Sequence, residues 1–218
     1  MIHSMKIYFL AIPAIIGIIF ATMMIISQEE ASVDLMVLNK ENLIHGSTIL
    51  GNPNAKISIV EFGDYQCTFC YKFHKNTMKQ IINEYVRDGK VNFVYKDFPL
   101  NGPSSIMASE ASYCAQKQGE FWTYHDVIYE NWGGENTGWV TRDTLSGFAR
   151  DTGLELDEFN SCMDNLTFRQ KVLDNEEFAK NIGIDATPSF MIFNDEEVYR
   201  IIGAQSFERF EQVLQELG

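Results

Sequence analysis

Cys67 and Cys70 are the residues whose type and spacing specify chemistry most directly in this 218-residue chain. Two residues separate them, they follow an apolar run from Ile57 to Phe62, and they open a segment with helical spacing. A Cys-x-x-Cys pair at a strand-to-helix junction is typical of a dithiol redox centre. The free N–H groups and partial positive charge of a helix start favour a thiolate, the species that performs thiol–disulfide exchange. We therefore expect Cys67 to be the nucleophile and Cys70 the resolving thiol.

Two other interpretations of this pair are open. It could be a purely structural disulfide, or it could supply two ligands to a metal site. A zinc ribbon needs a second pair of similar spacing, and Cys114 and Cys162, the other two cysteines, do not have it; we therefore expect no metal. Four cysteines in an exported chain favour two disulfides. Pairing Cys67 with Cys70 leaves Cys114 to pair with Cys162, and the alternative is two free buried thiols.

The periodicity around the cysteines predicts the elements that position them. In chain order these are a strand at 56–62, a helix from Cys67 to about 88, a strand at 91–98, a helical block at 104–181, strands at 189–194 and 197–202, and a helix at 207–217. A β-α-β unit followed by a hairpin and a helix, with further helices inserted between the two halves, is an α/β sandwich. The aromatic residues Tyr65, Phe69, Tyr71 and Phe73 are candidates for an apolar rim that meets unfolded substrates, although half of them are expected in the core.

The N-terminal segment predicts a membrane anchor. Residues 7–26 carry no charge, and about twenty apolar residues match the length of a membrane-spanning helix. Lys6 precedes this stretch and Glu29 and Glu30 follow it, so the positive-inside tendency places the rest of the chain outside the cytoplasm. A cleaved signal peptide and a buried soluble helix are the alternatives. The expected division is a signal-anchor transmembrane helix at 1–27, a polar tether at 28–45 and one domain at 46–218.

The overall composition excludes one large class of partners. The net charge is −13 and the isoelectric point is near 4.7, whereas nucleic-acid binding needs a basic face. We expect the excess of acidic residues to lie on a solvated surface. A hydrophobic content of 45% and an aromatic content of 13% are sufficient for a packed core.

The chain resembles the DsbA-like thiol–disulfide oxidoreductases of the thioredoxin superfamily over residues 46–218. The resemblance rests on the strand end Glu61-Phe62, the segment 64–70 that reads Asp-Tyr-Gln-Cys-Thr-Phe-Cys, the helical insertion, and the segment 187–190 that reads Thr-Pro-Ser-Phe. It implies a thioredoxin fold with an inserted helical subdomain at about 104–181. The central dipeptide here is Thr68-Phe69, and this dipeptide helps to set the acidity of the first thiol.

The resemblance also implies roles for four further residues. It places a cis peptide bond between Thr187 and Pro188 beside the dithiol, where the Thr187 backbone can pair with an extended substrate segment; an ordinary trans proline is the alternative. It makes Glu61 a proton relay for the buried thiol, with a pKa raised by burial, and Lys96 its charged partner. The alternative for Glu61 and Lys96 is a solvated pair at the strand ends.

The expected function is therefore that of a membrane-tethered dithiol oxidase whose catalytic domain faces the extracytoplasmic side. Its substrates would be reduced exported proteins, it needs no metal or organic cofactor, and the resemblance implies a membrane quinone-linked reoxidase as its partner. One rival is a disulfide reductase or isomerase, which a very negative reduction potential would reveal. Another is a membrane-tethered metal- or peptide-binding module, which stoichiometric copper or zinc binding blocked by alkylation of Cys67 would reveal.

Overall fold

The computed structural model describes residues 40–218, and residues from Leu43 to Gly218 form one compact unit. The expected anchor at 1–27 and most of the expected tether lie outside the described residues. Within the described part, no helix has both the length and the apolar character needed to cross a membrane. The last residues of the expected tether are not extended, because Lys40–Ile44 form a short helix, α2, in which Leu43 is buried.

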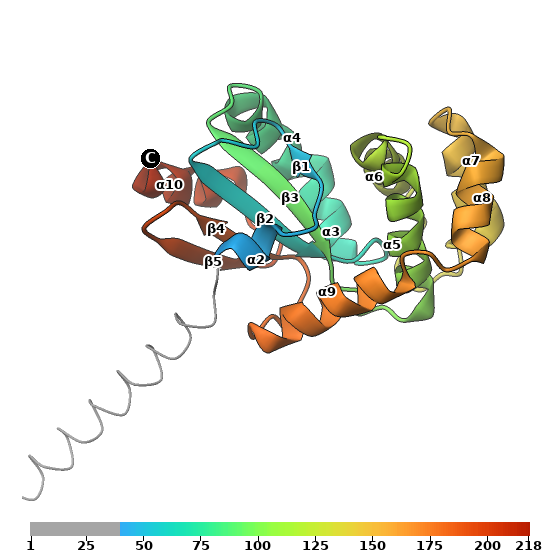
Figure 1. The fold of residues 1–218 in the computed structure, drawn as a ribbon. Coiled ribbons are helices and arrows are strands. Elements are labelled where there is room, and N and C mark those ends of the chain that lie inside the picture. Colours follow the sequence, from blue (N-terminus) through green and yellow to red (C-terminus); the bar gives the residue numbers. More distant parts are fainter. Residues whose placement is uncertain (1–39) are drawn as a thin grey trace, which may run out of the picture. The chain divides into compact units, whose positions relative to one another are not determined.

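A mixed sheet, with its strands in the order β1-β3-β2-β4-β5, forms the centre of this unit (Figure 1). Its strands are β1 (Ile49–Leu50), β2 (Ile57–Gly63), β3 (Val91–Asp97), β4 (Ser189–Phe193) and β5 (Val198–Ile202). β2 runs parallel to β3 and antiparallel to β4. Every residue of β2, β3 and β4 is buried, as expected for strands covered on both faces.

One face of the sheet is covered by a long helical run and by the C-terminal helix. The elements are α3 (Thr68–Phe73), η1 (His74–Met78), α4 (Lys79–Ile81) and η2 (Ile82–Val86), which follow one another without a break, and α10 (Phe207–Leu217). The ring of Phe73 lies 4.5 Å from that of Phe190 and 5.4 Å from that of Phe210, measured between centroids. This aromatic cluster holds the start of the helical run, and with it the cysteine pair, against the end of β2.

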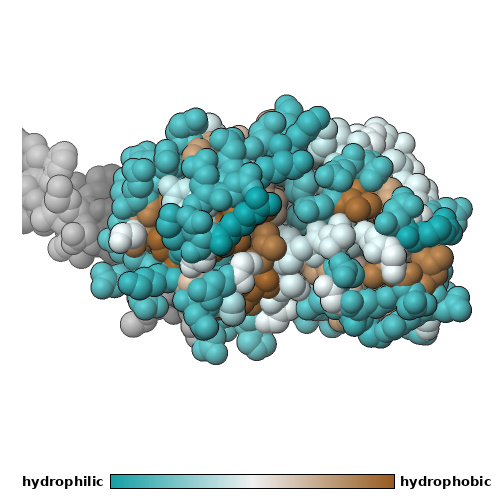
Figure 2. All heavy atoms as spheres, turned by 90° about the horizontal axis from the view of Figure 1, so that it is seen from above, coloured by the Kyte–Doolittle hydropathy of each residue, from teal (hydrophilic) through white to brown (hydrophobic). Residues whose placement is uncertain are grey.

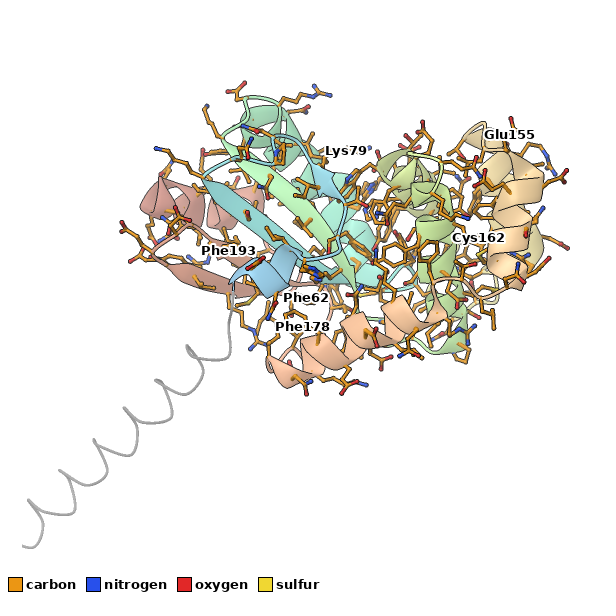
Figure 3. All side chains as sticks on the ribbon, in the orientation of Figure 1. Phe62, Lys79, Glu155, Cys162, Phe178 and Phe193 are labelled. Atoms are coloured by element: carbon orange, nitrogen blue, oxygen red, sulfur yellow. A yellow bond between two sulfur atoms is a disulfide. The ribbon has the colours of Figure 1, made fainter. Side chains whose placement is uncertain are left out.

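The helical insertion carries a second apolar core. Its helices are α5 (Pro103–Gln116), α6 (Phe121–Glu130), α7 (Arg142–Asp151), α8 (Leu156–Asp164) and α9 (Arg169–Asn181). A disulfide joins Cys114 in α5 to Cys162 in α8, which is the predicted pairing. Helix α9 packs on the other face of the sheet, where the rings of Phe62 and Phe178 stack with 6.3 Å between centroids (Figure 3).

The face drawn in Figure 2 is largely hydrophilic, with apolar patches separated by polar side chains. Among the described residues, the large apolar side chains that are exposed are Phe69, Leu100, Leu166 and Ile202. Phe69 lies between the two cysteines in sequence and is 55% exposed, whereas Tyr65 and Phe73 are buried. The predicted aromatic rim is therefore reduced to Phe69 and the half-buried Tyr71.

The predicted elements agree with the observed ones to within two residues at each boundary, and besides α2 two features were not predicted. Strand β1 pairs Ile49 with Val94, but two residues are too few to show a periodicity in the sequence. The helical run widens to π-type hydrogen bonding at 74–78 and 82–86, which leaves the amphipathic pattern of the sequence nearly unchanged.

Candidate active site

Cys67 occupies the N-cap of α3, directly beyond the carboxyl end of β2. Its backbone is extended, with φ −66° and ψ 125°, and its sulfur accepts a hydrogen bond from the amide of Cys70 at 3.4 Å. An N-cap side chain satisfies the free N–H groups of the first helical turn. Cys67 is 5% exposed and Cys70 is fully buried, and both are free thiols in this structure. An incoming thiolate would therefore reach the sulfur of Cys67 first.

The two thiols differ strongly in acidity. The hydrogen bond from the Cys70 thiol, with smaller contributions from the side chain of Thr187 and the amides of Cys70 and Phe69, lowers the pKa of Cys67 to about 6 in spite of burial. Burial, together with the thiol and the charge of Cys67, raises the pKa of Cys70 well above its ordinary value. The pair thus has one sulfur that is a thiolate at neutral pH and one that keeps its proton, as the predicted roles of nucleophile and resolving thiol require.

Asp64 fixes the loop that connects β2 to the dithiol, a role that the sequence analysis did not assign to it. Its carboxylate accepts hydrogen bonds from the amide of Gln66 at 2.8 Å, the amide of Asn101 at 2.7 Å and the hydroxyl of Ser105 at 2.6 Å. Burial raises the pKa of Asp64, and these hydrogen bonds oppose the rise. The available clue was an acidic residue at the end of an apolar strand, where a carboxylate needs several donors.

The segment before β4 reaches the same site from the strand beside β2. The peptide bond between Thr187 and Pro188 is cis, as the resemblance implied. The carbonyl oxygen of Thr187 lies 3.4 Å from the sulfur of Cys67. Ser189, the first residue of β4, pairs with Phe62 at the end of β2, which brings the two chain segments together. The predicted substrate-binding residues therefore border the sulfur that a substrate would attack.

Glu61 lies beneath the dithiol on β2 and is 1% exposed. Burial, and then the charge of Cys67, raises its pKa well above the ordinary carboxyl value. Its charge in turn contributes to the raised pKa of Cys70, so the carboxyl and the buried thiol interact electrostatically. A carboxyl with a raised pKa keeps its proton to a higher pH than an exposed one, and it can supply that proton to a neighbouring sulfur.

The predicted pairing of Glu61 with Lys96 is wrong. In the register of β2 with β3, Glu61 lies beside Tyr95, and Lys96 lies beside Phe62. Because successive side chains of a strand point to opposite faces, Lys96 faces away from the dithiol. Its ammonium donates to the carbonyl of His45 at 3.2 Å and lies 5.4 Å from the ring centroid of Phe178, a residue labelled in Figure 3. Burial lowers the pKa of Lys96 to about 8.

A histidine and tyrosine cluster packs behind the dithiol. The hydroxyl of Tyr65 lies 3.0 Å from Nδ1 of His125, and Nε2 of His74 lies 2.8 Å from the carboxylate of Asp126. His74, His125 and Asp126 offer ligand atoms that lie within 4.8 Å of one another. Bonds of 2.0–2.1 Å in a tetrahedral zinc site bring ligand atoms to about 3.4 Å from one another. The present spread and the existing hydrogen bond describe a packed polar cluster better than a metal centre.

The comparisons with known proteins agree with this geometry. A family model described as Thioredoxin matches residues 44–216. Disulfide bond formation protein D of Bacillus subtilis is 28% identical over 158 residues, which cover 71% of each chain. The crystal structure of oxidised BdbD from Bacillus subtilis superposes with a TM-score of 0.72 at 26% identity, covering 79% of this chain and 93% of that one.

A second solved structure, alpha-DsbA1 of Wolbachia pipientis, superposes with a TM-score of 0.70 at 26% identity and covers 79% of this chain and 91% of that one. The family model extends over most of the chain, and it includes β2, the cysteine pair, the helical insertion and the Thr187–Pro188 segment. These findings confirm the resemblance that the sequence indicated. The chain belongs to the thioredoxin family and is a DsbA-like thiol–disulfide oxidoreductase.

Proposed function

We propose that this enzyme is an oxidase that introduces disulfides into exported proteins through Cys67 and Cys70. The observation that carries the proposal is the difference in acidity between the two thiols, with a pKa of about 6 at Cys67 and a raised pKa at Cys70. Stabilising the Cys67 thiolate stabilises the reduced enzyme. The Cys67–Cys70 disulfide is then readily reduced, which makes it an oxidant toward substrate thiols.

The geometry supports a sequence of two exchanges. A substrate thiolate attacks the sulfur of Cys67, a new substrate–Cys67 bond forms, and the Cys67–Cys70 bond breaks. Cys70 leaves with the electron pair and takes a proton from the carboxyl of Glu61, whose pKa is also raised, because the raised pKa of Cys70 favours the thiol. A second substrate thiolate then attacks the substrate sulfur of the mixed disulfide. Cys67 leaves as a stable thiolate, so that two substrate thiols are oxidised and the enzyme is reduced.

An extended substrate segment can be held beside Cys67. The carbonyl of Thr187, 3.4 Å from the sulfur, is placed to accept a backbone hydrogen bond from such a segment. The exposed ring of Phe69 lines a groove of about 440 Å³ that continues between the active-site helix and the start of α10, past Thr77 and Phe207. A partly unfolded chain presents both a free backbone and apolar side chains, which these two features would recognise.

The site of action and the electron acceptor also belong to the proposal. The uncharged stretch at 7–26 supports a membrane anchor with the catalytic domain on the extracytoplasmic side, where disulfides persist. A reduced enzyme must pass two electrons to an oxidant before its next turnover. A membrane quinone-linked reoxidase is the partner that the family resemblance implies. Retention of the full-length chain in the membrane fraction after carbonate washing tests the anchor, and recovery of a soluble form that begins near residue 30 would refute it.

The reduction potential of the Cys67–Cys70 pair, measured against glutathione, tests the direction of the reaction. We expect a value in the range of disulfide oxidants, between about −120 and −200 mV. A value near that of thioredoxin, about −270 mV, would instead favour the reductase alternative. Cys67→Ser should abolish exchange, whereas Cys70→Ser should accumulate mixed disulfides. An active Cys67→Ser enzyme would refute the assignment of the nucleophile.

A further inference from the structure

Glu135 makes a contact with the dithiol motif that the sequence did not suggest. It lies in the loop between α6 and α7, far from the motif in sequence. Its carboxylate oxygen Oε2 accepts a hydrogen bond from the amide of Thr68 at 3.1 Å and another from the Thr68 hydroxyl at 3.1 Å. Thr68 directly follows Cys67 and is the first residue of α3. The helical insertion therefore places a carboxylate next to the reactive sulfur.

This carboxylate and the sulfur of Cys67 share the free donors at the start of the helical run. The first amides of a helix have no partner within the helix and need acceptors from outside. The sulfur of Cys67 accepts a hydrogen bond from the amide of Cys70 at 3.4 Å, and the amide of Phe69 also lowers the pKa of Cys67. The amide of Thr68 donates its hydrogen bond to the carboxylate of Glu135 instead. One of the donors that could face a thiolate is thus bound to a competing anion.

The loop that carries Glu135 is fixed to the active-site segment at two further points. The indole N–H of Trp132 donates to the carbonyl of Gln66 at 3.2 Å, and the ring of Trp132 stacks on Tyr71 with 4.6 Å between centroids. These contacts bind the loop on both sides of Cys67. Within the loop, the hydroxyl of Thr137 donates to the carbonyl of Gly133 at 2.8 Å. Glu135 is therefore presented by an ordered turn and not by a freely moving chain.

We propose that Glu135 is a positioning residue that moderates the oxidising power of the enzyme by placing a negative charge at the start of the active-site helix, where it opposes the Cys67 thiolate. The inference rests on the proposed function in taking Cys67 as the reactive sulfur. The other titratable groups that face Cys67 are Cys70 on the same helix and Glu61 on β2, and the test leaves both unchanged. A purely structural cap would affect the stability of the loop but not the acidity of Cys67.

Glu135→Gln removes the charge and keeps an oxygen that can accept from Thr68. Removing a like charge near the protein surface should lower the pKa of Cys67 by about 0.5. The equilibrium with glutathione should then move roughly threefold toward the reduced enzyme at pH 7, because a more acidic thiol stabilises that form. Glu135→Lys reverses the charge and should lower the pKa further. Raised salt should reduce the differences, since the carboxylate is exposed.

The measurement is the pH titration of thiolate absorbance in the reduced protein, paired with the glutathione equilibrium. Glu196→Gln is the matched control, because Glu196 is exposed at the far end of β4, in the turn to β5, and the change in charge is the same. If the wild type has no thiol that titrates near pH 6, the proposed function fails. If the wild type has one and Glu135→Gln leaves its pKa within experimental error or raises it, the role of Glu135 is refuted.

Discussion

The low pKa of Cys67 predicts that the reduced enzyme gains stability as the pH rises. The pKa of Cys67 is about 6 in the folded protein, against an ordinary value of 9.0. A group whose pKa is lowered by folding contributes stability that is complete above the unfolded pKa and is lost as the pH falls through the folded one. Between pH 6 and pH 8 the folded protein releases the proton of Cys67, while most unfolded chains keep it.

The size of this effect follows from the two pKa values. At pH 6 the folded thiol is half ionised, which contributes about 0.4 kcal/mol, and at pH 8 the contribution is about 2.5 kcal/mol. The free energy of unfolding of the reduced enzyme should therefore rise by about 2 kcal/mol over this range. Cys67 is 5% exposed, so screening by solvent reduces the value only modestly. The oxidised enzyme has no ionisable thiol at this position and should not show this contribution.

The assay is urea unfolding of the reduced protein at pH 6, 7 and 8, with Cys67→Ser as the matched control. Serine keeps the shape of the N-cap and does not ionise in this range. Glu61 and Cys70 also titrate with raised pKa values, and the charge of Cys67 contributes to both shifts. The difference between the two profiles therefore measures the ionisation of Cys67 together with its effect on these two groups. Profiles that run parallel, or a wild type that loses stability relative to Cys67→Ser as the pH rises, would refute a lowered pKa at Cys67.

Three further predictions concern the supporting residues. Replacing both Cys114 and Cys162 by Ala opens a loop of 48 residues and should lower the free energy of unfolding by about 4 kcal/mol in the loop-entropy model. Exchange activity, assayed below the melting temperature of the variant, should be retained. Loss of activity in the folded variant would contradict this. Glu61→Gln should slow the release of Cys70 by up to about 100-fold in stopped-flow measurements. Because the pKa of Glu61 is raised, the wild type should lose stability relative to this variant as the pH rises above 4.5, and a constant difference would count against the raised pKa. Lys96→Met should leave the reduction potential unchanged, and a clear shift in that potential would restore Lys96 to the site.

The sequence by itself determined the reaction class and the main elements. A Cys-x-x-Cys pair after an apolar strand, with a Thr-Pro segment before a hairpin, specifies a dithiol centre because each part is local and has a period or a spacing of its own. The same reasoning found the disulfide between Cys114 and Cys162 by elimination among four cysteines. The resemblance to the DsbA-like family also pointed to Glu61, a carboxylate within an apolar strand.

Only the tertiary structure decided which of the distant residues reach the dithiol. The resemblance pairs Lys96 with Glu61, but the register of β2 with β3 places Lys96 on the opposite face. That register depends on pairing between residues 34 apart in sequence, such as Ile57 with Val91. Glu135 and Asp64 act on the site through hydrogen bonds to Thr68, Asn101 and Ser105, which no spacing along the chain reveals. Local patterns are set by neighbouring residues, whereas the charges around a reactive sulfur come from segments that folding brings together.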